Sequence, residues 1–501
     1  MILVWLIGLL MGGGLLAFLV GQWNKTLPRW ISLYTLIIGI IALISFWIEH
    51  YEAINIGSME PWLIDFQQDW IPSFGISFHL AIDGLSLLLL ILTFFLGILA
   101  ILCSWKEITE HHGFYHFNLL WILAGISGVF MAMDLFLFYF FWEIMLIPMY
   151  FLIGIWGSKN REYAAYKFFI FTQASGLLMF ISILALYFTH AQSTGRYTFD
   201  YFALLGTVMA PQTAFWLMMG FMIAFAVKLP LVPFHTWLPD AHSEAPTAGS
   251  LILAGLLLKT GAYGILRFVL PLFPEVAKTF APWAMLLGVI GIIYGAILAF
   301  SQTDLKRLIA YTSVSHMGFV ILGIFAFNEL ALQGVVMQLL THAISTGALF
   351  IMAGMLKERL HTRQLDEMGG LWFQMPKMGA IAVLFAMAAL GLPGLGNFVA
   401  EFLILLGAFK SSVWLTVPAT IGLIFSAIYS LRMIQKVFLG PIPETAPISD
   451  FSWREVFIMA VLTISIIWLG LYPQPIINTA RPMINQIEHL FPTEFKNQTI
   501  K

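Results

Sequence analysis

The feature that most constrains the fold is a succession of apolar stretches about 17 to 25 residues long, the length an α-helix needs to cross a bilayer. Hydrophobic residues make up 60% of the 501-residue chain, and charged residues only 10%. This composition is typical of membrane proteins and predicts an all-α polytopic membrane protein. We expect 14 spans, near residues 2–21, 30–48, 82–104, 114–133, 135–157, 167–190, 213–235, 246–270, 281–300, 307–327, 331–355, 378–409, 414–438 and 455–472.

Basic residues in alternate loops predict the orientation, because cytoplasmic loops collect Lys and Arg. One set of loops holds 15 of the 24 basic residues, namely Lys25, Arg29, Lys106, Lys159, Arg161, Lys167, Lys306, Arg307, Lys357, Arg359, Arg363, Lys377, Arg432, Lys436 and Arg454. The alternate set holds 7, namely Arg196, Arg267, Lys278, Lys410, Arg481, Lys496 and Lys501. Both termini are therefore expected outside the cytoplasm. The first apolar stretch has no basic region before it and no small-residue cleavage site after it, so we expect it to be a retained span.

The longest predicted extramembrane segment, near residues 49–81, is acidic and has no Lys or Arg. Its carboxylates are Glu49, Glu52, Glu60, Asp65 and Asp69. The run HHGFYH, residues 111–116, falls in a predicted cytoplasmic loop and is interpreted as a solvated turn.

Cysteine and charge content exclude several classes of function. The one cysteine, Cys103, cannot form an internal disulfide, ligate an iron–sulfur cluster with other cysteines or belong to a CxxCH haem site. Redox chemistry linked to this chain would therefore take place in another subunit or on a freely bound molecule. The net charge is −2, and no run of basic residues is suited to nucleic acid.

Ionisable residues inside the predicted spans are the strongest functional signal, because a Lys or Asp at a helix centre costs about 2.5–3.5 kcal/mol even on mild insertion scales. These residues are Glu143, Lys228, Lys259, His316, His342, Glu401 and Arg432. The separation along the chain from Glu143 to Lys228 is the same as that from His316 to Glu401. The separation from Lys228 to Lys259 is likewise the same as that from Glu401 to Arg432.

The repeated spacing predicts two halves of opposite topology, because the shift that carries the first set of residues onto the second crosses five spans, an odd number. Each half has a broken helix beside its middle member: Pro230 and Pro233 follow Lys228, and LGLPGLGNF, residues 390–398, precedes Glu401. Broken helices are tolerated in a bilayer only where backbone is buried in protein or lines a wet cavity. Chance coincidence of the spacings is the alternative.

The domain organisation follows from this pattern. We expect three helices and the acidic external loop over residues 1–113. Two inverted five-helix repeats follow over 114–280 and 281–440, and the last span and a tail occupy 441–501.

The residue types are suited to proton transfer. A lysine in a low-dielectric site holds its proton less tightly, whereas a nearby carboxylate such as Glu143 favours the charged form, so a moving partner would switch Lys228. Histidines titrate near neutral pH and can pass protons on. A path Glu143, Lys228, Lys259, His316, His342, Glu401 would carry protons laterally through the protein.

Each member has a simpler interpretation. The lysines could extend to the membrane interface, and His316 and His342 could be hydrogen-bonded packing residues. Arg432 is interpreted as an interfacial cation outside the path. His235 is a further candidate for the path, and for His235 and His242 a role in a gate or loop is favoured over metal binding because Pro239 lies between them.

Three motifs carry a resemblance to a known family. VKLPLVPFHTWLPDAHSEAPTAGS and LAGLLLKTGAYGILR, within residues 227–267, and TDLKRLIAYTSVSHMGF, residues 303–319, resemble the proton-pumping antiporter-like subunits of respiratory complex I and of multi-subunit sodium/proton antiporters. FHLAIDGLSLLLL (78–90), CSWKEI (103–108) and LGLYPQP (469–475) are most similar to the M-type chains of bacterial NADH:quinone oxidoreductase, the counterparts of mitochondrial subunit four. Glu401 agrees, since the L-type and N-type chains and the antiporters typically have lysine there.

The resemblance implies roles for individual residues. Glu143 and Lys228 would be the ion pair of the first half-channel, Lys259 the central lysine, His316 and His342 connecting residues, and Glu401 the terminal site.

It also implies partners. No cofactor is expected in this chain, flavin and iron–sulfur clusters belong to other subunits, and quinone is bound elsewhere in the complex. Chains L and N would be neighbours in the bacterial inner membrane, among membrane lipids, with both termini periplasmic. A component of a sodium/proton antiporter is the alternative. A quinone or haem protein is disfavoured because no single span offers paired axial histidines.

Overall fold

The computed structural model describes residues 1–56, 62–441 and 448–491. Glu60, Lys496 and Lys501 of the predicted outer segments lie outside these ranges. The α-helices in chain order are α1 (Ile2–Val20), α2 (Leu27–Ile56), α3 (Gly84–Cys103), α4 (His112–Met131), α5 (Leu135–Ile144), α6 (Leu146–Trp156), α7 (Arg161–Thr194), α8 (Tyr201–Leu204), α9 (Pro211–Lys228), α10 (Trp237–Glu244), α11 (Thr247–Ile252), α12 (Leu258–Gly264), α13 (Leu270–Leu272), α14 (Pro274–Ser301), α15 (Leu305–Ile324), α16 (Glu329–Leu360), α17 (Leu371–Gln374), α18 (Pro376–Ala389), α19 (Gly396–Ser411), α20 (Val413–Phe438), α21 (Trp453–Leu471) and α22 (Gln474–Leu490).

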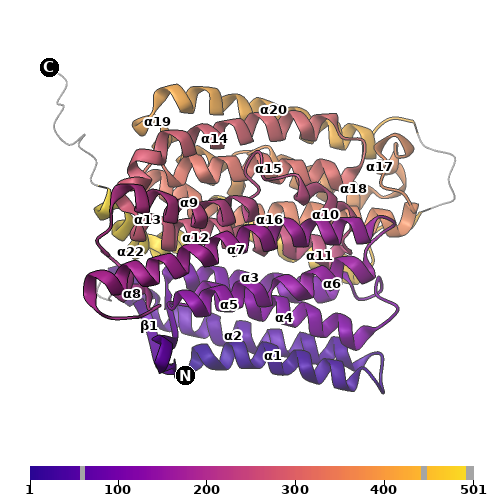
Figure 1. Cartoon of the computed structure of the whole chain (residues 1–501). Helices are drawn as coiled ribbons and strands as arrows, with labels where there is room; N and C mark the ends of the chain where they lie inside the picture. The colour runs from indigo at the N-terminus through magenta and orange to yellow at the C-terminus, as the bar shows by residue number, and fades with distance from the viewer. Residues whose placement is uncertain (57–61, 442–447, 492–501) are drawn as a thin grey trace.

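The long helices run side by side, with α1 and α2 at one edge of the bundle and α14 and α20 at the opposite edge (Figure 1). In the described part of the chain, 12 helical spans are long and apolar enough to cross a membrane. The expected number of 14 also included spans near 213–235 and 378–409. These two are the broken ones, because α9 stops at Lys228 and α18 stops at Ala389. The helical membrane architecture is therefore confirmed, with 12 continuous spans and two interrupted ones in the described residues, although the chain also contains one β-hairpin.

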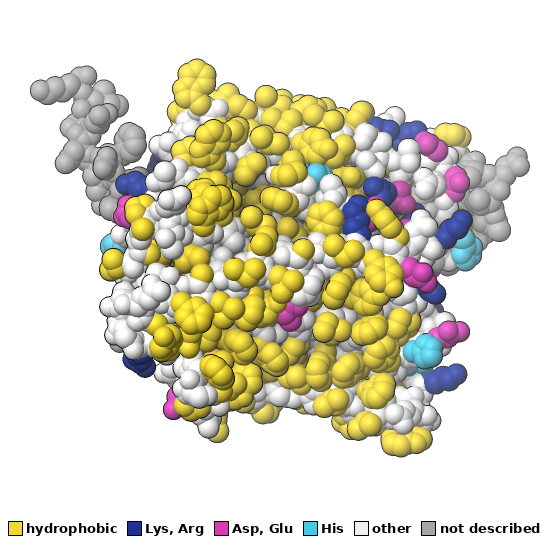
Figure 2. All heavy atoms as spheres, in the orientation of Figure 1, with side chains coloured by type: hydrophobic (Ala, Val, Ile, Leu, Met, Phe, Trp, Pro, Cys, Tyr) yellow, Lys and Arg dark blue, Asp and Glu magenta, His cyan; other side chains and the backbone are white. Residues whose placement is uncertain are grey.

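Burial separates central helices from peripheral ones. The most apolar windows of Thr247–Leu272 and of α16 are completely buried, whereas fewer than half of the residues in those of α1, α2, α20 and α21 are buried. Hydrophobic side chains cover the middle of the visible face, and charged side chains gather toward its two ends (Figure 2). Such an apolar belt suits lipid contact, so the polar residues of the central helices face protein and not lipid.

Loops from the predicted basic-rich set meet at one end of the bundle, which we call the basic end. Lys357 Nζ donates to Ser158 Oγ at 2.6 Å, and the amide of Ser158 donates to the carbonyl oxygen of Glu244 at 2.8 Å. The amide of Leu305 donates to the carbonyl oxygen of Arg363 at 2.9 Å. The first residue and helix α22 lie at the other end (Figure 1), which we call the outer end.

The predicted external loop begins with the end of α2, up to Ile56, and contains a β-hairpin. Strands β1 (Trp62–Ile71) and β2 (Ile76–Asp83) pair antiparallel and are joined by the 3₁₀ turn η1 (Pro72–Phe74). The alternation of apolar and polar residues in ISFHLAID was the sequence signal for a strand. Tight packing of β2 against the end of the bundle stabilises the two strands.

His79 of β2 attaches this hairpin to α8. Its Nε2 lies 3.0 Å from Asp65 Oδ1 and its Nδ1 2.5 Å from Asp200 Oδ2. Burial alone would lower the pKa of His79, but the hydrogen bonds and charges of Asp200 and Asp65 outweigh it, so the pKa is raised above its ordinary value.

The structure also differs from the sequence-based expectation at the run HHGFYH and in the C-terminal part of the chain. HHGFYH is not a solvated turn: α4 begins at His112, and both His112 and His116 are buried. The last helix of the described residues, α22, is a separate amphipathic element with one buried face, because its apolar residues recur at helical spacing between polar ones.

Candidate functional site

Four of the predicted residues form a line of contacts through the centre of the bundle. Lys259 Nζ donates to His342 Nδ1 at 2.7 Å, the rings of His342 and His316 are 5.6 Å apart, and His316 Nδ1 shares a hydrogen bond of 2.8 Å with Glu401 Oε1. All four side chains are buried. We call this line, Lys259 to Glu401, the central polar line.

The line lies near the middle of the helical spans that carry it. The helical span that carries Lys259 starts with α11 at Thr247, and α15, which carries His316, starts at Leu305; both starts are at the basic end. Lys259 and His316 each lie roughly three turns beyond these starts, which corresponds to a depth of about 16–18 Å at the usual helical rise. That is close to half of a hydrocarbon core of about 30 Å.

Local helix geometry places Lys259. Its short helix α12 stands between two π-helical turns, η2 (Leu253–Leu257) and η3 (Ile265–Val269). A π turn widens the helix and changes which backbone carbonyls are free, and such turns are frequent at functional sites. The carbonyl oxygen of Ala254 accepts a hydrogen bond of 2.6 Å from Lys259 Nζ. This bond and His342 hold the ammonium group.

The Glu401 end of the line contains two residues that sequence reasoning missed. Gln338 Nε2 donates to Glu401 Oε1 at 3.4 Å, and Tyr429 Oη lies 3.4 Å from His316 Nε2. Gln338 could have been found, because it precedes His342 by one helical turn and shares its helix face. No sequence signal pointed to Tyr429. Glu401 Oε2 has no hydrogen-bond partner among the described residues.

The second break brings backbone close to that free oxygen. Residues 390–395 separate α18 from α19, and Gly391 and Gly394 have φ values of 82° and 95°, which glycine adopts most readily. A Cβ on Gly391 would lie 3.4 Å from Glu401 Oε2. Glu401 itself stands in the second turn of α19.

Lys228 lies apart from this line, at the last residue of α9. Its side chain is completely buried and Nζ has no hydrogen-bond partner among the described residues. Nζ is 5.2 Å from the centre of the Trp142 ring and 5.4 Å from that of Phe168. Lys228 is therefore held by aromatic faces, and the predicted break after it is confirmed over residues 229–236.

Glu143 is close enough for its charge to act on Lys228, but the two do not form a contact ion pair in this structure. The Glu143 side chain is half-buried on α5, and its Oε1 has no hydrogen-bond partner among the described residues. A Cβ on Gly176 of α7 would approach that oxygen to 3.0 Å. The pair is thus open, with Trp142 beside both members.

Comparisons with known proteins agree on one family. Residues 132–426, more than half of the chain, match the family model described as NADH:quinone oxidoreductase/Mrp antiporter, TM. The chain belongs to this family. A Pseudomonas aeruginosa protein named NADH-quinone oxidoreductase subunit M is 53% identical, with 97% of each chain covered. The Escherichia coli K12 protein of the same name is 52% identical, with 98% of each chain covered.

Solved structures give the same result. A chain of respiratory complex I from Thermus thermophilus has a TM-score of 0.87 at 29% identity, covering 98% of this chain and 99% of that one. A chain of the Mrp complex from Dietzia has a TM-score of 0.85 at 19% identity, covering 98% of each chain. The second likeness shows the antiporter-like fold alone.

In this member of the family, His235 lies between Lys228 and α10 without joining the central polar line. Its ring is 5.5 Å from that of Tyr294, and its Nδ1 has no partner among the described residues. The described residues contain no group of three His, Cys, Asp or Glu placed to hold a metal ion.

Arg432 also stands outside the line. Its guanidinium is 4.3 Å from the Phe300 ring and donates to the Phe300 carbonyl oxygen, between α20 and the end of α14. It is only partly buried, in agreement with its interpretation as an interfacial cation.

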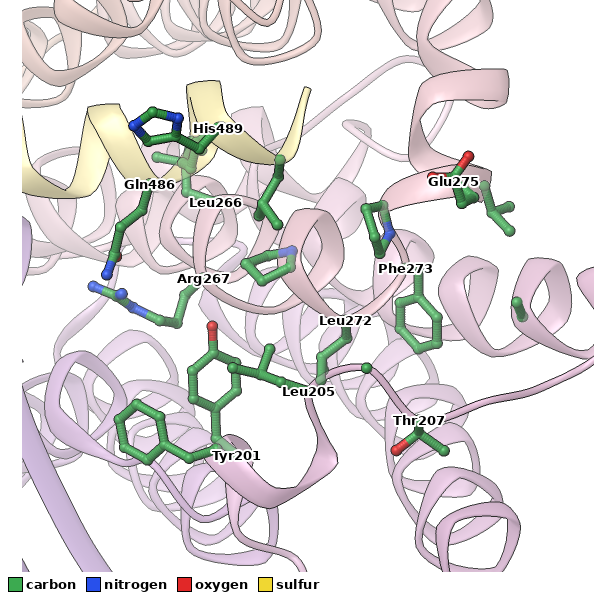
Figure 3. Close-up of a pocket in the computed structure, with 18 of the residues that line it drawn as sticks. Tyr201, Leu205, Thr207, Leu266, Arg267, Leu272, Phe273, Glu275, Gln486 and His489 are labelled. Atoms are coloured by element: carbon green, nitrogen blue, oxygen red, sulfur yellow. The ribbon is translucent and has the colours of Figure 1, made fainter. Parts of the chain in front are cut away.

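A cavity at one end of the bundle is separate from these residues. It has a volume of about 800 Å³ and lies at the outer end (Figure 3). Apolar side chains such as Leu205 and Phe273 line most of it, with Arg267 and Gln486 at one side. None of the residues predicted for proton transfer lines this cavity.

Proposed function

We propose that this chain is a proton-translocating subunit of the membrane arm of an NADH:quinone oxidoreductase. The observation that carries the proposal is the buried line of contacts from Lys259 to Glu401, in a chain whose family relatives at 52% and 53% identity are named subunit M of that enzyme. The relatives' names refer to a complex, and the redox step belongs to its other subunits. Flavin, iron–sulfur clusters and bound quinone are accordingly assigned to partner subunits.

Each residue of the line has a defined part in the transfer. Lys259 gives a proton to His342 through their direct hydrogen bond, and His316 exchanges a proton with Glu401 through theirs. His342 Nε2 is unpartnered among the described residues, which leaves it free to reach the neighbouring His316 ring through water. The free oxygen Oε2 of Glu401, beside the break at 390–395, is the terminal acceptor.

Lys228 and Glu143 form the switch of the first half-channel. The aromatic faces of Trp142 and Phe168 hold the lysine away from the carboxylate, so the open pair described above is one of two states. In the other state the ammonium pairs with Glu143. The proton affinity of Lys228 differs between these two states, and redox energy from the other subunits must drive the change from one state to the other.

The division into two inverted repeats, residues 114–280 and 281–440, is part of this proposal. Its supports are the paired equal spacings among the ionisable residues and the two helix breaks, one after Lys228 and one before Glu401. The outer segments, 1–113 and 441–501, flank the repeats.

The chain is a membrane protein, and we place it in the bacterial inner membrane with both termini on the periplasmic side. The basic-rich loops at one end of the bundle support this orientation. Other subunits of the complex are the partners. Chains L and N are assigned as direct neighbours, and lipids as the contacts of the remaining apolar surface.

A component of a sodium/proton antiporter is the second candidate, because the Mrp chain has the same fold. Glu401 and the identity of the subunit M relatives favour the first candidate. Pumping that continues at full rate without sodium would exclude the antiporter.

The test of the proposal uses Lys228→Ala and Glu143→Gln in the assembled complex. NADH-driven proton uptake by inverted membrane vesicles is expected to disappear, because the switch has lost its base or its partner. Electron transfer from NADH to an artificial acceptor reports assembly and is expected to remain.

Two residues on the exposed start of α14 provide matched controls, Lys278→Ala and Glu275→Gln. Both controls are expected to pump normally. Normal pumping by either Lys228→Ala or Glu143→Gln would contradict the switch.

A further inference from the structure

His242 is the most unusual buried group outside the central polar line. It lies on α10, the short helix after the break at Lys228, and its side chain has no exposure to solvent. The imidazole stacks on Phe350 of α16, with ring centroids 4.5 Å apart and planes within 6°. Neither ring nitrogen has a hydrogen-bond partner among the described residues.

An imidazole without partners is costly inside a protein. A neutral ring carries one N–H donor and one acceptor. A buried donor or acceptor that makes no hydrogen bond costs the full free energy of its removal from water. Buried polar groups without protein partners are commonly satisfied by internal water. The ring of His242 therefore marks a site where water is expected in the bundle interior.

The neighbours of His242 connect it to two different regions. Toward the basic end, Lys306 Nζ donates to Ala245 O at 2.9 Å and to Ser250 Oγ at 3.3 Å, and the same hydroxyl donates to the carbonyl oxygen of His242. Toward the centre, His242 stacks on Phe350, which lies about two turns after His342 on α16, and His342 bonds Lys259 Nζ. His242 thus stands between Lys306 and the central polar line.

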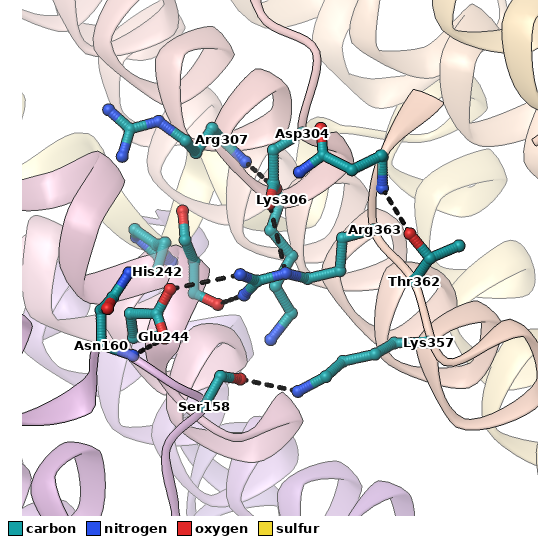
Figure 4. Close-up of polar contacts among 12 residues, drawn as sticks. Ser158, Asn160, His242, Glu244, Asp304, Lys306, Arg307, Lys357, Thr362 and Arg363 are labelled. Atoms are coloured by element: carbon teal, nitrogen blue, oxygen red, sulfur yellow. Dashed lines mark hydrogen bonds and ion pairs between the residues drawn. The ribbon is translucent and has the colours of Figure 1, made fainter. Parts of the chain in front are cut away.

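Lys306 lies among polar and charged side chains of the basic end, including Glu244, Asp304 and Arg363 (Figure 4). Arg363 joins Glu244 and Asp304 by ion pairs of 3.2 Å each. Glu244, two residues after His242, also lines a crevice of about 320 Å³ together with Asp240 and Arg307. Water that enters this crevice has a short polar route to α10.

We propose that His242 carries protons from the crevice at the basic end to the Lys259–His342 pair through buried water, while the Lys228–Glu143 switch controls when the central lysine is loaded. The inference rests on the proposed function, because it adds an input to the same central line. It assigns α10 two tasks: its preceding break serves Lys228, and its buried histidine serves Lys259.

The decisive variant is His242→Gln, which keeps a polar side chain but cannot relay a proton through an imidazole. In inverted vesicles, NADH-driven proton uptake at neutral pH is expected to fall roughly tenfold or more, since a positioned proton-transfer group typically contributes roughly 10²- to 10⁴-fold. The loss should shrink as the pH on the basic side is lowered, because proton supply then rises. A purely structural role would give a loss independent of pH.

Other charged groups near α10 belong to the interpretation of that pH profile. They are Asp240 and Glu244 on α10 itself, Lys167 on α7, Asp304, Lys306 and Arg307 at the start of α15, Arg363 and Glu107 in the neighbouring loops, Lys259 on α12, and His342 and Lys357 on α16. They are present in both proteins, so the difference between parent and variant isolates His242.

His190→Gln is the matched control, because His190 lies near the opposite end of the bundle, where it bonds Thr207 at 2.9 Å. It is expected to pump like the parent. Pumping by His242→Gln within about twofold of the parent at every pH, far short of the loss a relay residue causes, would overturn the inference.

Two comparisons make the result unambiguous. If Lys259→Met abolishes pumping while His242→Gln does not, only the role of His242 is wrong; if Lys259→Met pumps normally, the proposed function itself fails. Should His242→Gln not assemble, a high-resolution map of the unmodified complex decides. Ordered water at the His242 nitrogens supports the inference, and their dry burial in a map that shows other internal waters overturns it.

Discussion

Asp83 is the residue whose removal has the most directly calculable effect. Its Oδ1 accepts from the amide of Ser86 at 2.8 Å and so caps α3, and its Oδ2 pairs with Arg267. Both charged side chains are almost completely buried. Arg267 lies on η3, about two helical turns after Lys259, so this ion pair anchors the helix that carries the central lysine.

The magnitude follows from these contacts. Removing one partner of a buried ion pair costs about 3–5 kcal/mol. Arg267 keeps the face of Trp62 at 4.6 Å and the Tyr263 hydroxyl at 3.3 Å, so we expect the lower end of that range. Asp83→Asn, which can still cap α3, should therefore lose about 3 kcal/mol of unfolding free energy. Asp83→Ala also loses the cap and should lose about 1 kcal/mol more.

The assay is unfolding of the full chain in detergent micelles by SDS, followed by circular dichroism. The control is the double variant Asp83→Asn with Arg267→Met, which removes the unpaired charge and should recover a large part of the loss. The reasoning is refuted if Asp83→Asn unfolds like the parent, or if the double variant is less stable than Asp83→Asn alone.

Two further predictions concern the outer end. Because the pKa of His79 is raised, its ion pairs with Asp65 and Asp200 stabilise the fold fully below the ordinary pKa of about 6.5 and progressively less as pH rises through the folded-state pKa. The midpoint of thermal unfolding, measured from about pH 6 to 9, should therefore fall with pH for the parent and change less for His79→Gln. A Cβ on Gly84 would collide with the carbonyl oxygen of Thr479, so Gly84→Ala should cost about 1–3 kcal/mol. It should also increase proteolysis at α22, whereas Gly8→Ala on α1, where nothing lies within 4 Å, should not.

Hydropathy predicted the helical spans well because the bilayer fixes their length and composition. It failed at the membrane surface, where those constraints end. The hairpin Trp62–Asp83 and the amphipathic helix α22 gain stability by packing onto the ends of the bundle, a contact that no local pattern of apolar residues specifies.

Residue chemistry identified most of the central polar line but not its order or its gaps. The sequence placed His316 before His342, whereas in space Lys259 bonds His342 first and His316 follows. Such lateral neighbours are set by helix packing and by the π turns around Lys259, which shift a helix face without leaving a mark in the hydrophobic pattern. Tyr429 was missed for the same reason.

The predicted pairing of Glu143 and Lys228 shows what spacing can and cannot establish. The spacing directed attention to two residues that are costly in a bilayer, yet the distance between them depends on the rotamer of a long side chain. The structure has the lysine beside Trp142 and Phe168. The same sequence is compatible with both positions of the Lys228 side chain. The spacing of the residues therefore cannot distinguish the open pair from the closed one.

The contrast between the two lysines bears on where movement occurs. Lys259 is fixed by a carbonyl oxygen and by His342, within a span that is buried along its whole apolar window. Lys228 has no hydrogen bond in the described structure and is followed by a stretch, 229–236, without regular helix. A side chain that must alternate between partners needs a weakly held position and a backbone that can adjust, and of the two lysines only Lys228 has both. The switching step of the proposed mechanism therefore belongs to the end of α9, and the line from Lys259 to Glu401 acts as its comparatively rigid conductor.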